Sequence, residues 1–227
     1  MKRLSILIII FSITNISAFG HIDHYKSYNY LEYELFRNNK LIGFHKYNFK
    51  RNNDFLTIKS HVEFNIIKFG VNLYKYKAVS EESYKNKKFF KFSSRTSQNK
   101  KEKYVNIMFD KKDNKLIVDG SSYKGDADKD FIVGTWWNHE IVKAKAQISA
   151  ISGRIIHQKV IFLGRKKLNI NGKNYDSLHF NFSSSDPNLP SKKKLNTDIW
   201  YDEKTNLWLK ASFDKTGHWE YRIKKHN

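Results

Sequence analysis

Residues 134–140, GTWWNHE, place two large aromatic side chains beside an amide, an imidazole and a carboxylate. His139 and Glu140 are of the types that carry general acid–base catalysis. Trp136 and Trp137 are of the type that lines apolar ligand pockets. Neighbouring side chains of a strand point to opposite faces, so one tryptophan should pack inward while the other faces a groove, a partner or a covering loop.

Two interpretations of this stretch stay open on sequence alone. In the first it is a corner of the core, where Asn138 caps a single helical turn. In the second, the tryptophans form the wall of a cavity, with Asn138 and His139 as polar guides. The second interpretation yields a predicted set of ligand-binding residues: Phe44, Phe64, Trp136, Trp137, Asn138, His139 and Trp200.

Signatures of common enzyme classes are missing from the sequence, including G-x-S-x-G, H-E-x-x-H and the P-loop. Adjacent carboxylates such as Glu81 and Glu82 diverge on a strand, so they do not form a catalytic pair. We therefore predict no catalytic residue and no cofactor. The alternative is an enzyme on an unusual scaffold, with a polar cluster near His139 and Glu140.

Two stretches resemble metal sites without completing one. HIDH at 21–24 offers two histidines, whereas zinc sites need three or four ligands. GDADKD at 125–130, within the predicted polar loop 121–130, lacks the glycine and the glutamate that complete an EF-hand loop. We predict no metal site.

The elements that must position these residues are strands. Apolar and polar residues alternate most clearly over 56–66, and the pattern is typical of an antiparallel strand with one buried face. The same rhythm, broken by short polar turns, runs over 31–35, 41–49, 71–84, 89–97, 104–110, 115–120 and 198–223. No helix of ordinary length is predicted. The fold class is all-β, a single curved antiparallel sheet closing into a half-barrel or barrel with at most short helical turns.

Some predicted strands are apolar on both faces, as LIGFHKYNF at 41–49 shows. A sheet with one solvent-exposed face does not need this pattern, which indicates either a curved half-barrel with an apolar hollow or a fully packed barrel with apolar outer flanks. In the last hairpins Trp208 alternates with Leu207 and Leu209, so it is expected on the opposite face, covered by a loop or open to a ligand.

The first 20 residues carry a positive start at Lys2 and Arg3, an apolar run and small residues near the end. This is the pattern of a secretory signal peptide, and the run is too short to span a bilayer. Cleavage after Gly20 would leave one domain, residues 21–227, and cleavage after Ala18 is the alternative. No other stretch is long and apolar enough to span a membrane. The chain has no cysteine, which excludes lipoprotein modification and disulfides.

The formal charge is +20, and +18 without Lys2 and Arg3 (40 basic against 22 acidic residues). An exported protein with 35 lysines and only 7 arginines is a poor candidate for nucleic acid, since planar phosphate recognition favours arginine. The charge favours anionic partners instead, such as lipid headgroups or acidic envelope polymers.

Four segments resemble, in order, an uncharacterised family of exported bacterial proteins with a domain of unknown function. They are ELFRNNKLIGFHKYNFKRNND (34–54), TWWN (135–138), SAISGRII (149–156) and DIWYDEKTNLWLKASFDKTGHWEYRI (198–223). That family is distantly similar to half-barrels of the LolA, LolB and VioE types. The resemblance covers nearly all of the mature chain and implies a fold and an envelope location, but no activity.

The leading hypothesis is a periplasmic or envelope protein of a Gram-negative bacterium that binds an apolar or amphipathic, lipid-like ligand without catalysis. Its mechanism would be burial of apolar ligand surface while lysines at the rim attract an anionic headgroup. The alternatives are the enzyme described above and an envelope assembly or scaffold protein whose apolar strands meet a partner.

Overall fold

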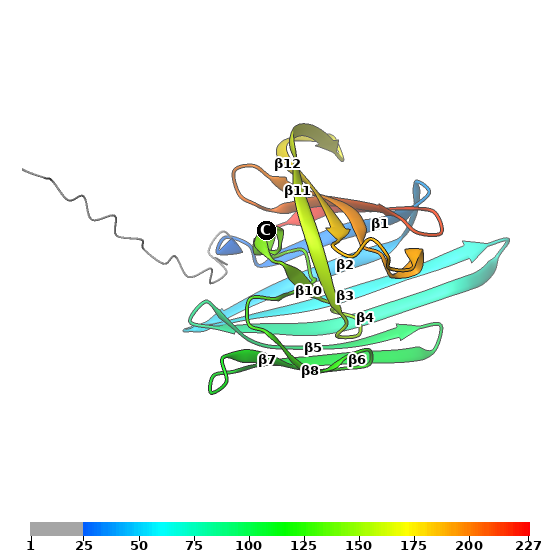
Figure 1. Ribbon diagram of the computed structural model, residues 1–227. Coiled ribbons are helices and arrows are strands. Elements are labelled where there is room, and N and C mark those ends of the chain that lie inside the picture. The colour runs from blue at the N-terminus through cyan, green and yellow to red at the C-terminus, as the bar shows by residue number, and fades with distance from the viewer. Residues whose placement is uncertain (1–24) are drawn as a thin grey trace, which may run out of the picture.

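The computed structural model describes residues 25–227, so the predicted signal peptide lies outside the described residues. These residues form one 15-stranded sheet in the order β8-β7-β6-β5-β4-β3-β2-β1-β15-β14-β13-β12-β11-β10-β9. The last strand, β15, pairs with the first, β1, and neighbouring strands are antiparallel except for the parallel pair β9 and β10. Figure 1 shows a curved sheet, and its two edge strands, β8 and β9, do not pair with each other. The predicted fold class is therefore confirmed, as a half-barrel.

The first half of the sheet consists of β1 (Tyr30–Arg37), β2 (Lys40–Asn52), β3 (Phe55–Lys68), β4 (Val71–Lys85), β5 (Lys88–Gln98), β6 (Lys101–Asp110), β7 (Lys115–Gly120) and β8 (Lys124–Asp128). The second half consists of β9 (Ile132–Val133), β10 (Ala146–Ile148), β11 (Ile155–Ile170), β12 (Lys173–Ser184), β13 (Asn196–Asp202), β14 (Trp208–Asp214) and β15 (His218–His226). Two short 3-10 helices, η2 (His139–Lys143) and η3 (Ser191–Lys193), interrupt this half.

Asparagine makes many of the hairpin turns. Asn38, Asn86, Asn99 and Asn171 each adopt the left-handed backbone conformation with φ between 47° and 53°. Asparagine tolerates this conformation better than most residues, and turns of this hand match the twist of the flanking strands. These turns fix the strand register, and the register sends every second side chain to the concave face.

The core lies on the concave face in three contiguous clusters. The largest packs strands β1, β2 and β13–β15 around the fully buried Trp208 and Trp137. A second fills the space over β5–β7 and includes Phe92 and Ile107. A third, smaller cluster centres on Phe64. A sheet that buries only one face produces the strict alternation seen in the sequence.

Two expectations about local structure were wrong. Trp208 does not lie on the outer face: a register shift between Trp200 and Tyr201 turns it inward, where it is fully buried and stacks on Tyr33 at 4.0 Å between ring centroids. The polar stretch at 121–130, expected to be a loop, contains the edge strand β8. An edge strand gains ladder hydrogen bonds from β7 without needing an apolar alternation.

Candidate functional site

Residues 131–153, called the strap below, cross the concave face of the sheet. They contain β9, η2 and β10, and in Figure 1 β10 lies between β11–β15 above and β4–β8 below. Buried side chains of the strap join two of the core clusters, through Trp137 and Ile141 in one and Val133 and Ile148 in the other. The hollow of the half-barrel is therefore largely occupied by the chain's own strap.

A buried carboxylate holds the strap against β4. Glu82 accepts hydrogen bonds from Trp137 Nε1 at 2.9 Å, Tyr84 Oη at 2.6 Å and Thr135 Oγ1 at 3.3 Å. Burial raises the pKa of Glu82, and the three donors act against that rise. Since two of the donors belong to the strap, Glu82 ties the TWWN element to the sheet.

Two tyrosine hydroxyls hold the strap backbone from opposite sides. Tyr47 of β2 donates to the carbonyl of Thr135 at 2.6 Å, and Tyr201 of β13 donates to the carbonyl of Trp136 at 2.9 Å. Trp136 itself has a left-handed backbone with φ of 57°, which is uncommon for a bulky residue. The fixed carbonyls on both sides stabilise this conformation, which turns the two tryptophans in different directions.

A cavity of about 170 Å³ remains between the strap and strands β2–β5 and β15. Its walls are mainly apolar and aromatic, with a few hydroxyl groups and one imidazole. Residues lining it include His45, Ser60, Val62, Tyr76, Ala78, Thr96, Trp136, Ile151 and Tyr221. An apolar pocket with a few polar groups is the usual form of a small-molecule site.

His45 is the ionisable group in this wall with the most unusual surroundings. It is 9% exposed, its Nε2 lies 2.9 Å from Ser60 Oγ, and its Nδ1 has no hydrogen-bond partner. Burial, with a smaller contribution from the charge of His61, lowers the pKa of His45 to about 3. The ring is therefore neutral at pH 7, and its Nδ1 is a buried atom without a partner in a residue that borders the cavity.

Among the predicted ligand-binding residues, Trp136 lines the cavity and contacts Tyr221, with ring centroids 5.5 Å apart. Phe64 is buried beside it and stacks on the lining residue Tyr76 at 4.7 Å. Trp137 is fully buried and packs against Phe49, so its ring belongs to the core.

Asn138 is the N-cap of η2, and His139 and Glu140 are its first residues; none of the three lines the cavity that His45 borders. Asn138 is buried and its side chain accepts from the backbone N–H of Glu140 at 3.2 Å, so the predicted capped turn is confirmed. His139 Nε2 lies 3.1 Å from Glu140, which also pairs with Lys143 at 2.9 Å. Asn138 and Glu140 line a second cavity, of about 280 Å³, rimmed by lysines. The imidazole and the carboxylate thus form a polar cluster with Lys143, apart from the His45 cavity.

Phe44 and Trp200 lie on the outer face of the sheet. Phe44 contacts His61 and has Lys46 Nζ 4.6 Å from its ring centroid. Trp200 stacks on His179 at 4.2 Å and has Lys210 Nζ at 5.2 Å. The structure therefore places these two on the opposite side of the sheet from the cavity.

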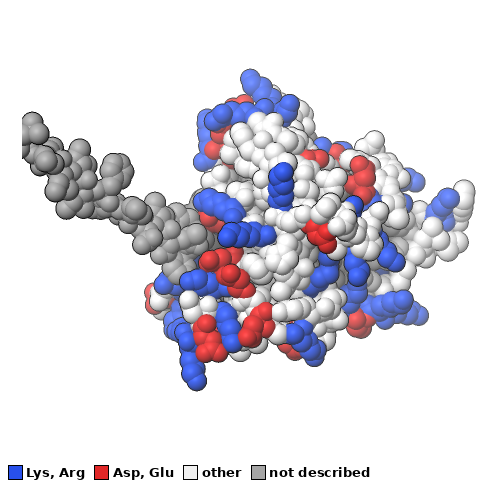
Figure 2. Space-filling view, viewed as in Figure 1, with Lys and Arg blue, Asp and Glu red and all other residues white. Residues whose placement is uncertain are grey.

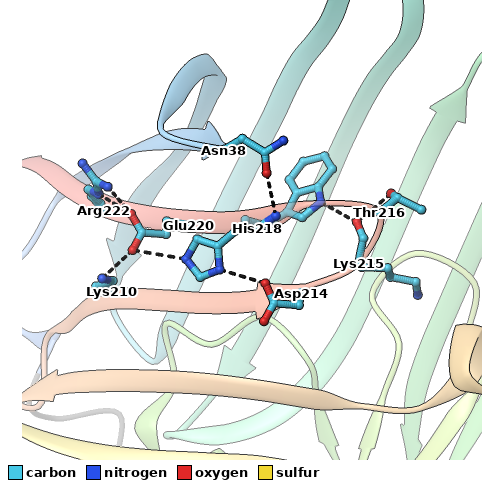
Figure 3. A network of polar contacts seen from close by, with 9 residues as sticks. Asn38, Lys210, Asp214, Lys215, Thr216, His218, Glu220 and Arg222 are labelled. Carbon is cyan, nitrogen blue, oxygen red and sulfur yellow. Dashed lines mark hydrogen bonds and ion pairs between the residues drawn. The ribbon is translucent and has the colours of Figure 1, made fainter.

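The outer face near Trp200 carries a polar network, drawn in Figure 3. Glu220 accepts from Lys210 at 2.6 Å and from Arg222 Nε at 2.7 Å, while His218 bridges Glu220 and Asp214. Burial on its own raises the pKa of Glu220, but the hydrogen bonds from Lys210 and Arg222 outweigh it and hold the pKa below its ordinary value. This network satisfies a nearly buried charge, and we assign it to stability.

Sequence reasoning missed His45, Tyr76 and Tyr221 as cavity residues. The signal was present: His45 shares its face with Tyr47 and Phe49, which are core residues, and this phase puts Phe44 outside.

Among the described residues, no group of three His, Asp or Glu side chains is placed to hold a metal ion. Within residues 25–227 we also find no helix with the length and apolarity needed to cross a membrane.

Comparison with solved structures supports the fold. The chain is similar to a crystal structure of a β-barrel-like protein with domain of unknown function DUF1849 from Brucella abortus, with a TM-score of 0.60 and 12% identity over 88% of this chain and 97% of that chain. A DUF1329 family protein from Desulfovibrio piger aligns over 90% of this chain and 88% of that one, with 9% identity and a TM-score of 0.20. The first likeness shows a shared β-barrel-like fold, and at this identity it shows nothing about activity.

Comparison of sequences gives the family. None of the curated proteins is significantly similar to this chain. The family profile of DUF6134, a domain of unknown function, matches residues 33–224, which span β1 to β15 and include the strap. The chain therefore belongs to the DUF6134 family.

Proposed function

We propose that this protein binds an apolar or amphipathic, lipid-like ligand without catalysis, and that one end of the ligand occupies the cavity beneath the strap. The observation that carries the proposal is the cavity itself, a mainly apolar space of about 170 Å³ with the buried imidazole of His45 and a few hydroxyl groups in its wall. A pocket of this kind buries the apolar surface of a ligand, and the few polar groups in its wall fix the orientation of the ligand.

The cavity volume sets the size of the bound group. At about 170 Å³ it is close to the ~150 Å³ apolar cavity that accepts benzene in other proteins. A benzene-sized group or a short segment of an alkyl chain fits, whereas the rest of a longer ligand would extend beyond the cavity. Burial of apolar ligand surface contributes roughly 25 cal/mol per Å², and the polar group nearest His45 fixes the orientation.

The proposal places the protein in the periplasm or envelope of a Gram-negative bacterium. It is supported by the signal-like first 20 residues and by the large positive charge, which would attract an anionic headgroup or the envelope surface. The test is the mass of the mature chain recovered from the periplasm of its native host. A first residue of His21 or Phe19 is expected, and an intact chain confined to the cytoplasm would refute the location.

Binding is tested with the fluorescent fatty acid cis-parinaric acid and with native mass spectrometry of protein purified from its host. We expect a bound lipid mass and saturable fluorescence. The variant Ala78→Leu fills the cavity, so it should weaken binding about tenfold or more while leaving thermal stability equal or higher. Asn48→Leu adds the same side chain at an exposed position of β2 and serves as the control. Equal binding by both variants, or a wild-type protein free of ligand that binds no probe, would reject the proposal.

A further inference from the structure

The hairpin of β3 and β4 projects beyond its neighbours. Pairing with β2 reaches no further than Gly43 opposite Phe64, and pairing with β5 begins at Tyr76 opposite Gln98. Residues 65–75 therefore form an arm with no strand on either side, which we call the tip. Figure 1 shows the tip as the cyan hairpin extending to the right of the sheet.

The tip carries a set of exposed apolar side chains. Phe69 at its end is 92% exposed, and Ile67, Val71 and Leu73 are each exposed by more than half. The projecting end at the right of Figure 2 is accordingly mostly white. Single exposed apolar residues are ordinary, but a contiguous exposed group marks a contact with a partner or a membrane.

The turn at the tip differs from most other hairpin turns of the sheet. Phe69 has a φ of 52° at the first turn position, where Asn38, Asn86, Asn99 and Asn171 stand in other hairpins, and Gly70 follows with a φ of 76°. A phenylalanine in this conformation is unfavourable, and Asn-Gly is the preferred pair for such a turn. Its ring contact within the fold is with its neighbour Lys68, whose Nζ lies 5.3 Å from the ring centroid. Phe69 thus weakens the turn and does not pack into the core. We infer that this large apolar side chain contacts something other than the folded chain itself.

The charge around the tip has one sign. Residues 64–80 contain Lys68, Lys75 and Lys77 and no aspartate or glutamate. A short apolar tip flanked by lysines matches the boundary of an anionic bilayer, where rings enter the acyl region and ammonium groups stay at the headgroups.

We propose that the tip, with Phe69 at its end, inserts into the surface of an anionic lipid bilayer and docks the protein there. This surface is separate from the cavity beneath the strap, and it would serve a protein that takes up or delivers an amphipathic ligand at the membrane. The docking itself does not depend on ligand binding, so either proposal can fail alone.

The test is a flotation or sedimentation assay of the full mature chain with vesicles made of an equal mixture of phosphatidylglycerol and phosphatidylcholine, and with vesicles of phosphatidylcholine alone. Wild type should bind the mixed vesicles, and bind less at higher salt. Phe69→Asn creates the favoured Asn-Gly turn, so it should fold at least as stably as wild type yet bind roughly tenfold to a hundredfold more weakly. Met108→Thr removes another exposed apolar side chain, from β6, and should bind as wild type.

Several outcomes would overturn the proposal. They are an absence of wild-type binding to the mixed vesicles, equal binding by Phe69→Asn, or equal loss in Met108→Thr. A wild-type dimer that becomes monomeric on Phe69→Asn, with no vesicle binding by either, would show instead that the tip meets a second copy of the chain. The cis-parinaric acid assay run on Phe69→Asn keeps the proposals apart, since cavity binding should be unchanged.

Discussion

Trp137 donates its indole N–H to Glu82 at 2.9 Å and thereby joins the strap to strand β4 inside the molecule. Glu82 is 2% exposed, and among residues 25–227 no cationic side chain pairs with it. A buried carboxylate without a counter-charge depends on its hydrogen bonds. The indole of Trp137 therefore packs in the core and also offsets part of the free-energy cost of burying the Glu82 carboxylate.

Trp137→Phe should lower the free energy of unfolding by about 2–4 kcal/mol. The variant removes one of the three donors to Glu82 and leaves space where the larger ring was. Urea denaturation followed by circular dichroism measures the change. Trp200→Phe, at a half-buried site on the outer face, should cost less than about 1 kcal/mol. Equal losses in the two variants would contradict the role given to the Trp137–Glu82 pair.

His45 should make the protein less stable as the pH falls. Its pKa is about 3 in the folded state, against an ordinary value of 6.5, because burial disfavours the charged ring. The unfolded chain then binds a proton that the folded chain does not, between pH 6.5 and about 3. The free energy of unfolding contributed by the neutral His45 ring is fully present above the pKa of the unfolded chain. Below that pKa it falls by about 1.4 kcal/mol per pH unit.

The check is the slope of unfolding free energy against pH, from urea titrations between pH 6 and 4.5. His179 and His226 also have lowered pKa values, chiefly through burial, so the wild-type slope contains their share. His45→Gln should reduce that slope by about 1.4 kcal/mol per pH unit. A slope unchanged by this substitution would mean that His45 titrates normally in the folded protein.

Much of the fold follows from local rules in the sequence. Period-two alternation gives the strand phases, and the polar Asn-containing turns give the hairpins, because each depends on only a few neighbouring residues. Asn138 was likewise predictable as a cap. The face of Trp208 was not, since a register shift between Trp200 and Tyr201 reverses the phase at that point.

The cavity was harder to predict, because it depends on where the strap crosses the sheet. Alternation assigns Phe64 and Trp136 to the interior, but it does not show that Trp137 fills the core while Trp136 borders a space. That division results from the left-handed backbone at Trp136 and from long-range bonds to Tyr47 and Tyr201. Phe44 and Trp200 lie on the outer face, as the alternation of β2 and β13 indicates.

Gly43 should not tolerate a side chain. A Cβ there would lie 2.1 Å from the backbone oxygen of Glu63 and 2.5 Å from the Cβ of Phe64, which are fixed in the neighbouring strand. Gly43→Ala should therefore cost more than about 3 kcal/mol or prevent folding. Gly172→Ala is the control: it has open space, and its φ of 79° costs only about 1–2 kcal/mol. Thermal denaturation of both variants tests this, and Gly43→Ala should have the lower melting temperature. Similar melting temperatures would contradict the predicted clash at Gly43.

Tyr201→Phe should loosen the strap more than the rest of the molecule. The hydroxyl of Tyr201 donates to the carbonyl of Trp136 at 2.9 Å, and its loss leaves a part-buried acceptor unpaired at a cost of about 1–2 kcal/mol. Hydrogen exchange followed by mass spectrometry should show faster exchange in peptides of residues 131–153 than in those of β6 and β7. Tyr104→Phe, which loses a bond to Asp119 between β6 and β7, should leave strap exchange unchanged. The strap forms one wall of the cavity, so a strap that opens more easily in Tyr201→Phe should also let cis-parinaric acid enter the cavity faster. Faster strap exchange without faster entry would show that the ligand reaches the cavity by another route.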